Sequence, residues 1–384
     1  MRNTTILHAE DLLLDGKEGM DDIFSFFTEL QKVFSGKETK KIRTSLKWDG
    51  SPSIVCGIHP ENNKFFIGTK SVFNKTPIIN YNLKDIKNNH KNNRDLVKIL
   101  SNLLVELPKM NINGVYQGDL LYWPSLVKKR LVNGTSYLTF KPNSITYSVD
   151  SGGELADNIR KSKFGIVFHT KYNGKRFSSL VPSYNPDISS FSKNKNIWVI
   201  DSSYNNISFL TDKEKTYISN KLKDIKKEKN NQFLDILSDT PNIKNYLTLY
   251  FNYCVREGNK SPNLNSFMNW LIYRIEDEKS KLKSSKGKEG RDEKRNLLFS
   301  FMNDHKDDFK KFFETRIIFS KIKNIFIRKI KNIKDVDTFF DINGKFKKTK
   351  PEGLVIVNDK NRVVKLIDRS EFSKNNFTIS RYKK

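Results

Sequence analysis

The stretch that organises this chain spans residues 44–55, which read Thr44-Ser45-Leu46-Lys47-Trp48-Asp49-Gly50-Ser51-Pro52-Ser53-Ile54-Val55. A lysine stands at the end of a short strand-like run, and Gly50 and Pro52 then predict a tight turn before a second β-branched run. Such a turn can hold the amine of Lys47 towards a pocket. An amine that is partly desolvated and close to other cations loses its proton readily and becomes a nucleophile. Lys47 is therefore a candidate catalytic residue.

The composition favours a polyanionic partner. The 384 residues allow two or three domains. The formal net charge is +27 and the isoelectric point is about 9.7, which favours nucleic acid as the first candidate partner and an anionic membrane as the second. The codon bias of an AT-rich genome also places lysine at functionally neutral surface positions, so the net charge alone does not decide the function.

The cysteine count and the N-terminus indicate the compartment. Cys56 and Cys254 are too few for a disulfide framework or a multi-cysteine zinc site. Glu10 and Asp11 stand where a signal peptide would have its apolar core. No run approaches the roughly 18 apolar residues of a membrane helix. We expect a cytoplasmic protein, in the host cytoplasm if it is viral, with no membrane partner.

Downstream of Lys47 the sequence predicts strands over residues 53–58, 64–70, 115–122 and 164–172. Lys70 is then expected near the same end of the sheet as Lys47. Asp119 interrupts an apolar strand, where an acid is costly to bury unless it is paired. It is a candidate site residue, although an edge strand would also accept it. In the last strand Phe168 and His169 are expected to point to opposite faces.

The character of the chain changes near residue 206. Apolar residues between 211 and 334 follow helical periods, and glycines are few, so this region is predicted to be an all-α insertion. Its lysine runs are solvated helix faces or a surface for nucleic acid. Strand patterns return at 350–357 and 362–368. The predicted organisation is a first part of a catalytic domain at 1–205, a helical insertion at 206–338, and C-terminal strands of the same domain at 339–384.

Five short segments, in this order, resemble the motifs of the covalent nucleotidyltransferase superfamily, which contains DNA ligases, RNA ligases and mRNA capping enzymes. They read Lys47-Trp48-Asp49-Gly50-Ser51, Gly118-Asp119-Leu120, Ile166-Val167-Phe168, Glu352-Gly353-Leu354-Val355 and Val364-Lys365-Leu366. The first motif, with serine after the glycine, most resembles that of phage RNA-ligase-like proteins. The chain departs from the pattern where Asp119 replaces the usual glutamate, and where Val363 stands in place of a second lysine two residues before Lys365.

The resemblance implies an α+β fold, with a ligase-type domain of antiparallel sheets and helices interrupted by the large all-α insertion. Only 19 residues follow Lys365, which is too short for a C-terminal OB domain. This length favours an RNA-ligase-like enzyme over a capping enzyme.

The resemblance also implies the chemistry. Lys47 would attack the α-phosphate of ATP to give lysyl-AMP, and the adenylate would then activate a polynucleotide, RNA rather than DNA, for sealing. Lys365 would be the second catalytic lysine, and Glu352 and Asp119 would bind Mg²⁺ or Mn²⁺. The nucleotide would be held by the residues Asp49, Gly50, Lys70, Asp119, Phe168 and Glu352. We expect a monomer.

Two other interpretations stay open. The chain can be an inactive nucleotidyltransferase fold that serves as a phage nucleic-acid-binding or structural protein. It can also transfer AMP to an acceptor that is not a nucleic acid.

Overall fold

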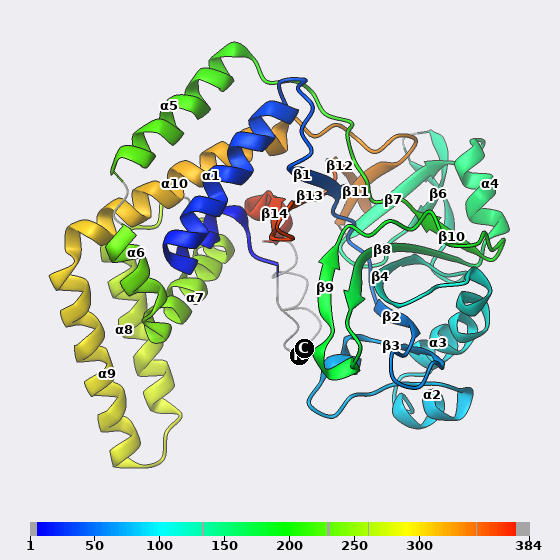
Figure 1. Ribbon diagram of the computed structural model, residues 1–384, viewed down its shortest axis with the longest axis horizontal. Coiled ribbons are helices and arrows are strands. Elements are labelled where there is room, and N and C mark those ends of the chain that lie inside the picture. Colours follow the sequence, from blue (N-terminus) through cyan, green and yellow to red (C-terminus); the bar gives the residue numbers. More distant parts are fainter. Residues whose placement is uncertain (1–5, 133, 229–230, 260, 343, 374–384) are drawn as a thin grey trace. The chain divides into compact units, whose positions relative to one another are not determined.

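The computed structural model describes residues 6–132, 134–228, 231–259, 261–342 and 344–373, and its ribbon is drawn in Figure 1. Its elements confirm the predicted α+β class. The chain divides into two compact units. The first comprises residues 1–6, 40–207 and 330–363, and the second comprises residues 7–39, 208–329 and 364–384.

The larger sheet of the first unit has six strands in the order β10-β8-β4-β2-β3, with β9 beside β8. Neighbouring strands are antiparallel except β10 and β8. The bounds are β2 (Ser53–Ile58), β3 (Phe65–Gly68), β4 (Val115–Tyr122), β8 (Phe164–Asn173), β9 (Val181–Tyr184) and β10 (Ile197–Ile200).

A second sheet of the first unit has five antiparallel strands in the order β12-β11-β7-β6-β5. Its bounds are β5 (Lys128–Val132), β6 (Thr135–Phe140), β7 (Ile145–Asp150), β11 (Asp337–Ile342) and β12 (Lys345–Thr349). In addition, β1 (Ile42–Leu46) pairs antiparallel with β13 (Gly353–Asn358). This pairing joins segments on either side of the helical insertion.

Short helices cover the sheets of the first unit. They are η2 (Lys70–Phe73), α2 (Leu83–Asn89), α3 (Arg94–Glu106), η3 (Leu107–Met110), α4 (Glu154–Lys161) and η4 (Phe177–Ser179). The side chain of Asn93 caps α3 by accepting a hydrogen bond from the backbone N–H of Leu96. Leu100 and Leu103 of α3 are fully buried among apolar side chains of β2, β4 and β8. Each such side chain stabilises the fold by about 1.5–3 kcal/mol.

The second unit is mostly helical. Its elements are η1 (Ala9–Asp15), α1 (Gly16–Val33), α5 (Asp212–Glu228), α6 (Asn231–Ser238), α7 (Pro241–Glu257), α8 (Leu264–Ser280), α9 (Ser285–Asp304), α10 (Lys306–Arg328), the residues of β14 (Val363–Ile367) from 364 onwards, and η5 (Arg369–Ser373). Phenylalanines hold it together. Phe27 of α1 packs edge-on against Phe319 of α10, and Phe34 packs in the same way against Phe326. Such aromatic pairs contribute beyond their buried area.

The unit boundaries differ from the predicted domains at both ends of the chain. Residues 208–329 form the core of the helical unit, close to the predicted 206–338. Residues 7–39 and 364–384, however, belong to the helical unit and not to the catalytic domain. The reason is that the apolar face of α1 is buried on α10, nearly 300 residues away in the sequence.

Charges are buried inside the helical unit. Lys323 and Glu10 form an ion pair of 2.6 Å, and both side chains are 2% exposed. Asp11 accepts hydrogen bonds from Arg316 and from Arg369. The basic run near residue 323 is therefore partly interior, and this part of it cannot be a surface for nucleic acid.

Candidate active site

The register of β1 on β13 brings Lys47 beside Glu352. Leu46 lies opposite Leu354 in this antiparallel pair. Lys47, which follows Leu46, therefore lies beside Gly353 and close to Glu352. The backbone N–H of Lys47 donates to the carbonyl of Gly353. The Lys47 ammonium Nζ lies 2.6 Å from Glu352 Oε2. Residues that are 305 positions apart thus form one charged group at the end of two paired strands.

The electrostatics of this group hold Lys47 in its charged form. Burial by itself lowers the pKa of Lys47. The charge and hydrogen bond of Glu352 act in the opposite direction, as do the carboxylates of Asp49 and Asp119, and the pKa of Lys47 lies above its ordinary value. Lys47 is therefore a paired ammonium in this state. Loss of its proton would require a weaker contact with Glu352.

Gly50 lets the turn after Lys47 lie flat on β4. A Cβ at Gly50 would stand 2.6 Å from the Cβ of Asp119 and 3.0 Å from the carbonyl oxygen of Leu120. The backbone N–H of Ser51 donates to the same carbonyl at 2.8 Å. The glycine is thus needed for close approach of two chain segments. It places the turn, and with it Lys47, against the strand that carries Asp119.

Asp49 anchors the turn and is occupied by protein donors. Its carboxylate accepts hydrogen bonds from Asn143 Nδ2, the Ser144 hydroxyl, and the backbone N–H groups of Ser144 and Ile145, at distances of 2.6–3.0 Å. Its own N–H donates to the Tyr147 hydroxyl at 2.7 Å. Asp49 is 5% exposed. The structure therefore gives Asp49 a positioning role, and contact with a nucleotide stays a prediction.

Asp119 lies on β4 opposite Ser53 of β2. Its carboxylate is 3.6 Å from Nε2 of His169. Burial favours the neutral acid, but His169, a hydrogen bond from Ser53 and the charge of Lys47 outweigh burial, so the pKa of Asp119 lies below its ordinary value. Asp119 is thus a carboxylate oriented by a histidine. Sequence reasoning did not single out His169, although strand alternation places it on the face opposite Phe168.

Phe168 does not point to this group. It is 1% exposed and packs edge-on against Tyr116 and Phe191 in the hydrophobic core. The predicted stacking of Phe168 on a base needs an accessible ring face, so its placement argues against that role. A register shift in the pairing of β4 with β8, between Gln117 and Gly118, sets which face each residue of this region takes.

Of the two other predicted lysines, Lys70 lies in the first unit and Lys365 in the helical unit. Lys70 is exposed at the start of η2, and within the described part of the chain it forms no ion pair. Lys365 belongs to the helical unit, where its backbone N–H donates to the carbonyl of Leu7. Its action on Lys47 stays a prediction.

Two carboxylates near Lys47 are of the ligand type that Mg²⁺ prefers. Across residues 6–373, apart from the gaps stated above, no three His, Cys, Asp or Glu side chains are grouped as a metal cage. Mg²⁺, however, is commonly held by one or two carboxylates together with water and phosphate oxygens. Glu352 and Asp119 both act on Lys47 and could supply these carboxylates.

A protein-family model matches residues 3–381 of the chain. The chain belongs to DUF6267, a family of unknown function. No curated protein and no solved structure matches it significantly.

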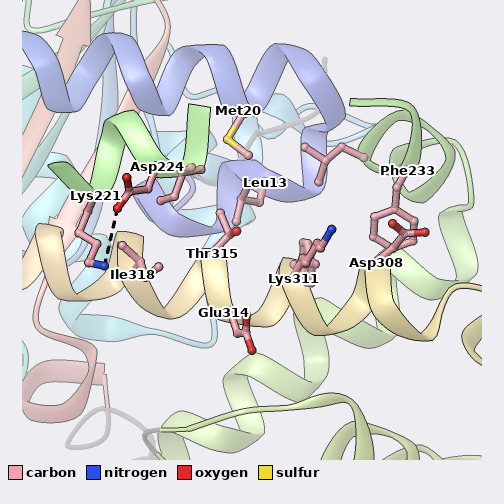
Figure 2. Close-up of a pocket in the computed structure, with 13 residues that line it drawn as sticks. Leu13, Met20, Lys221, Asp224, Phe233, Asp308, Lys311, Glu314, Thr315 and Ile318 are labelled. Atoms are coloured by element: carbon pink, nitrogen blue, oxygen red, sulfur yellow. Dashed lines mark ion pairs between the residues drawn. The ribbon is translucent and has the colours of Figure 1, made fainter. Parts of the chain in front are cut away.

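The helical unit of the DUF6267 protein has a pocket of its own, with a volume of about 210 Å³. Figure 2 shows it between α1, α5, α6 and α10, with Met20 and Leu13 above Thr315 and an ion pair of 3.9 Å between Lys221 and Asp224. Its lining mixes apolar side chains with charges of both signs. No predicted site residue lines this pocket.

None of the helices in the described ranges has the length and apolar character to cross a membrane.

Proposed function

We propose that this chain is an ATP-dependent nucleotidyltransferase that forms a lysyl-AMP intermediate at Lys47 and passes the adenylate to a polynucleotide, RNA before DNA. The observation that carries the proposal is the contact of 2.6 Å between Lys47 and Glu352, with Asp119 and Asp49 acting on the same ammonium. A partly buried lysine surrounded by carboxylates at a strand end suits covalent catalysis with a metal–nucleotide substrate.

The first step needs a free amine. The ammonium of Lys47 releases its proton to solvent water, and the lone pair of Nζ attacks the α-phosphorus of ATP. A P–N bond forms, and the bond from the α-phosphorus to the bridging oxygen breaks, so pyrophosphate leaves with the electron pair. Mg²⁺ would shield the phosphate charge when bound. Glu352 and Asp119 would supply carboxylate oxygens to the ion.

The second step transfers AMP to a 5′-phosphate, and a 3′-hydroxyl then displaces AMP to seal the strand. The formal charge of +27 supports a polynucleotide acceptor, because phosphate contacts by lysine and arginine supply most non-specific affinity. Exposed lysines on α5, such as Lys223, Lys226 and Lys227, are available for such contacts.

The test is covalent labelling with ATP that carries the label on the α-phosphate, in Mg²⁺ or Mn²⁺, followed by denaturing electrophoresis. Wild type is expected to take up the label, and Lys47→Ala to show none. Lys87→Ala is the matched control, because Lys87 is an exposed lysine of the same unit that is not a candidate site residue. If wild type takes up no label at any pH tested, the proposed enzyme activity is rejected.

The alternatives have their own readouts. A raised pKa of Lys47 also suits an inactive fold, in which the pair with Glu352 is structural. In that case the chain binds RNA with a strong salt dependence and takes up no label. If labelled AMP leaves Lys47 when a protein or small acceptor is added, and not when 5′-phosphorylated RNA is added, the acceptor is not a nucleic acid.

A further inference from the structure

The first unit contains a cavity of about 620 Å³ that the proposed reaction does not use. Its walls come from β7, α4, β10 and the turn before β11, elements that can be followed in Figure 1. Trp48 lines it, whereas Lys47, Asp119 and Glu352 do not. Pockets of roughly 300–1,000 Å³ are the usual size for small-molecule ligands.

Two tryptophans line this cavity, and one row of aromatic rings holds both. Trp48 packs on Tyr147 with ring centroids 5.0 Å apart, and Trp198 packs on Tyr122 at 6.2 Å. Phe140 lies between the tyrosines, 5.4 Å from Tyr147 and 5.2 Å from Tyr122. Tyr122, Phe140 and Tyr147 are all at most 2% exposed. The two indoles are therefore supported from within the fold. Trp48 is 7% exposed and Trp198 is half-buried, so a ligand would meet mainly the preorganised ring of Trp198.

The charge of the cavity is opposite to that of the chain. Four carboxylates line it, those of Asp150, Glu154, Asp201 and Asp335, with Lys334 as the one lysine among the lining residues. The local formal charge is thus −3 in a chain of +27. All four carboxylate residues are exposed. A local charge of this sign attracts cations and repels phosphates.

The turn that presents Asp335 is tightly built. Ile333 and Val336 form an isolated antiparallel bridge, and the backbone N–H of Val336 donates to the carbonyl of Ile333. Asp335 has a φ of 59°, in the left-handed region that residues other than glycine seldom adopt. Such conformations persist where the surrounding structure holds them, often at ligand sites. The turn thereby holds the backbone of Asp335 at the cavity wall.

We propose that this cavity binds an organic cation with several ammonium groups, that is, a polyamine. Indole faces attract ammonium groups through cation–π interactions, and carboxylates pair with the remaining charges. A nucleotide would suit the rings, but its phosphates would meet four carboxylates. A metal ion would suit the carboxylates but not the indoles. The site is independent of nucleotidyl transfer at Lys47.

The probe is spermidine, titrated calorimetrically into the full chain at physiological ionic strength. We expect saturable binding with one spermidine per chain, against the repulsion of the net positive charge. Trp198→Leu is expected to weaken binding at least about fivefold, because a partly desolvated cation–π contact is lost. Glu154→Gln is expected to weaken it roughly two- to fivefold, the usual effect of one solvated ion pair.

Each variant has a matched control. Asp157→Asn removes a carboxylate from the same helix as Glu154, but Asp157 pairs with Arg160 and does not line the cavity. Trp270→Leu changes a tryptophan of the helical unit. Both controls are expected to bind spermidine like wild type, and so is Lys47→Ala, which separates this proposal from the one for the active site.

Three results would overturn the polyamine site. The first is the absence of saturable spermidine binding to wild type. The second is equal affinity in Glu154→Gln and Asp157→Asn together with unchanged affinity in Trp198→Leu; Glu154 is exposed, so its variant is expected to fold. The third is that adenosine or Mg²⁺ binds to wild type, that Trp198→Leu abolishes this binding, and that spermidine does not compete with it.

Discussion

Replacing Glu352 by glutamine is predicted to make Lys47 more reactive as a nucleophile. Glutamine keeps the size of the side chain and removes the charge that lies 2.6 Å from Nζ. Burial, which lowers the pKa of Lys47, is then opposed only by the weaker influence of Asp49 and Asp119, and the pKa of Lys47 is expected to fall.

The size of the effect follows from the exposure of the two partners. Removing one partner of a fully buried ion pair costs about 3–5 kcal/mol, whereas exposed pairs contribute about 0–1 kcal/mol. The side chain of Glu352 is 6% exposed and that of Lys47 is 30% exposed, so this pair lies between the two limits. A change of about 1–2 kcal/mol corresponds to roughly five- to thirtyfold more free amine at a fixed pH.

The assay is competitive acetylation of lysines over a range of pH, with the peptide that contains Lys47 quantified by mass spectrometry. In Glu352→Gln the midpoint of the Lys47 labelling curve is expected to move to lower pH, while its plateau stays the same. The pair of Glu106 with Lys109 supplies the control, since Lys109 is 54% exposed. Glu106→Gln is expected to change labelling of Lys109 by no more than roughly two- to threefold. Unchanged or slower labelling of Lys47 in Glu352→Gln would refute the reasoning.

Three further predictions concern stability, each read from urea unfolding of the full chain. Glu10→Gln is expected to lower the free energy of unfolding by about 3–5 kcal/mol, because it leaves the buried Lys323 charge unpaired, and Glu10→Leu combined with Lys323→Met is expected to cost less than the single change. Asp49→Asn is expected to cost about 2–3 kcal/mol, since its carboxylate accepts four hydrogen bonds, and an unchanged midpoint would contradict the anchoring role. Burial, followed by the charges of Arg369 and Lys323, lowers the pKa of His8 well below 6.5. Below about pH 6.5 the His8 side chain is protonated in the unfolded chain but stays neutral in the folded chain, so the free energy of unfolding is expected to fall as the pH drops. His8→Gln is expected to flatten this part of the profile.

Local patterns predicted the elements of this chain well. The segment 115–122 is apolar around Gly118 and Asp119, and it forms β4 with the same bounds. The polar run near residue 90 separates α2 from α3. These features depend on residues close together in the sequence, where alternation and capping act directly.

The surroundings of Lys47 were only partly predictable. Glycine and proline after Lys47 predicted the turn. They did not predict that the Asp49 carboxylate would accept hydrogen bonds from residues 143–145. Strand alternation separated Phe168 from His169 without telling which one faces Asp119. That choice depends on which face of the sheet is covered by other elements, and Phe168 lies on the face that carries the hydrophobic core.

The sequence by itself determined the strand and helix patterns, the excess of positive charge and the position of a lysine in a tight turn. Only the tertiary structure decided which distant residues meet. The register of β1 on β13 placed Glu352 at Lys47, and burial of α1 on α10 drew Glu10 and Asp11 into the interior of the helical unit. It also gathered Trp48 and Trp198 around one cavity. The physical reason is that burial and pairing between remote segments are properties of the assembled chain, and no local pattern encodes which segments will share them.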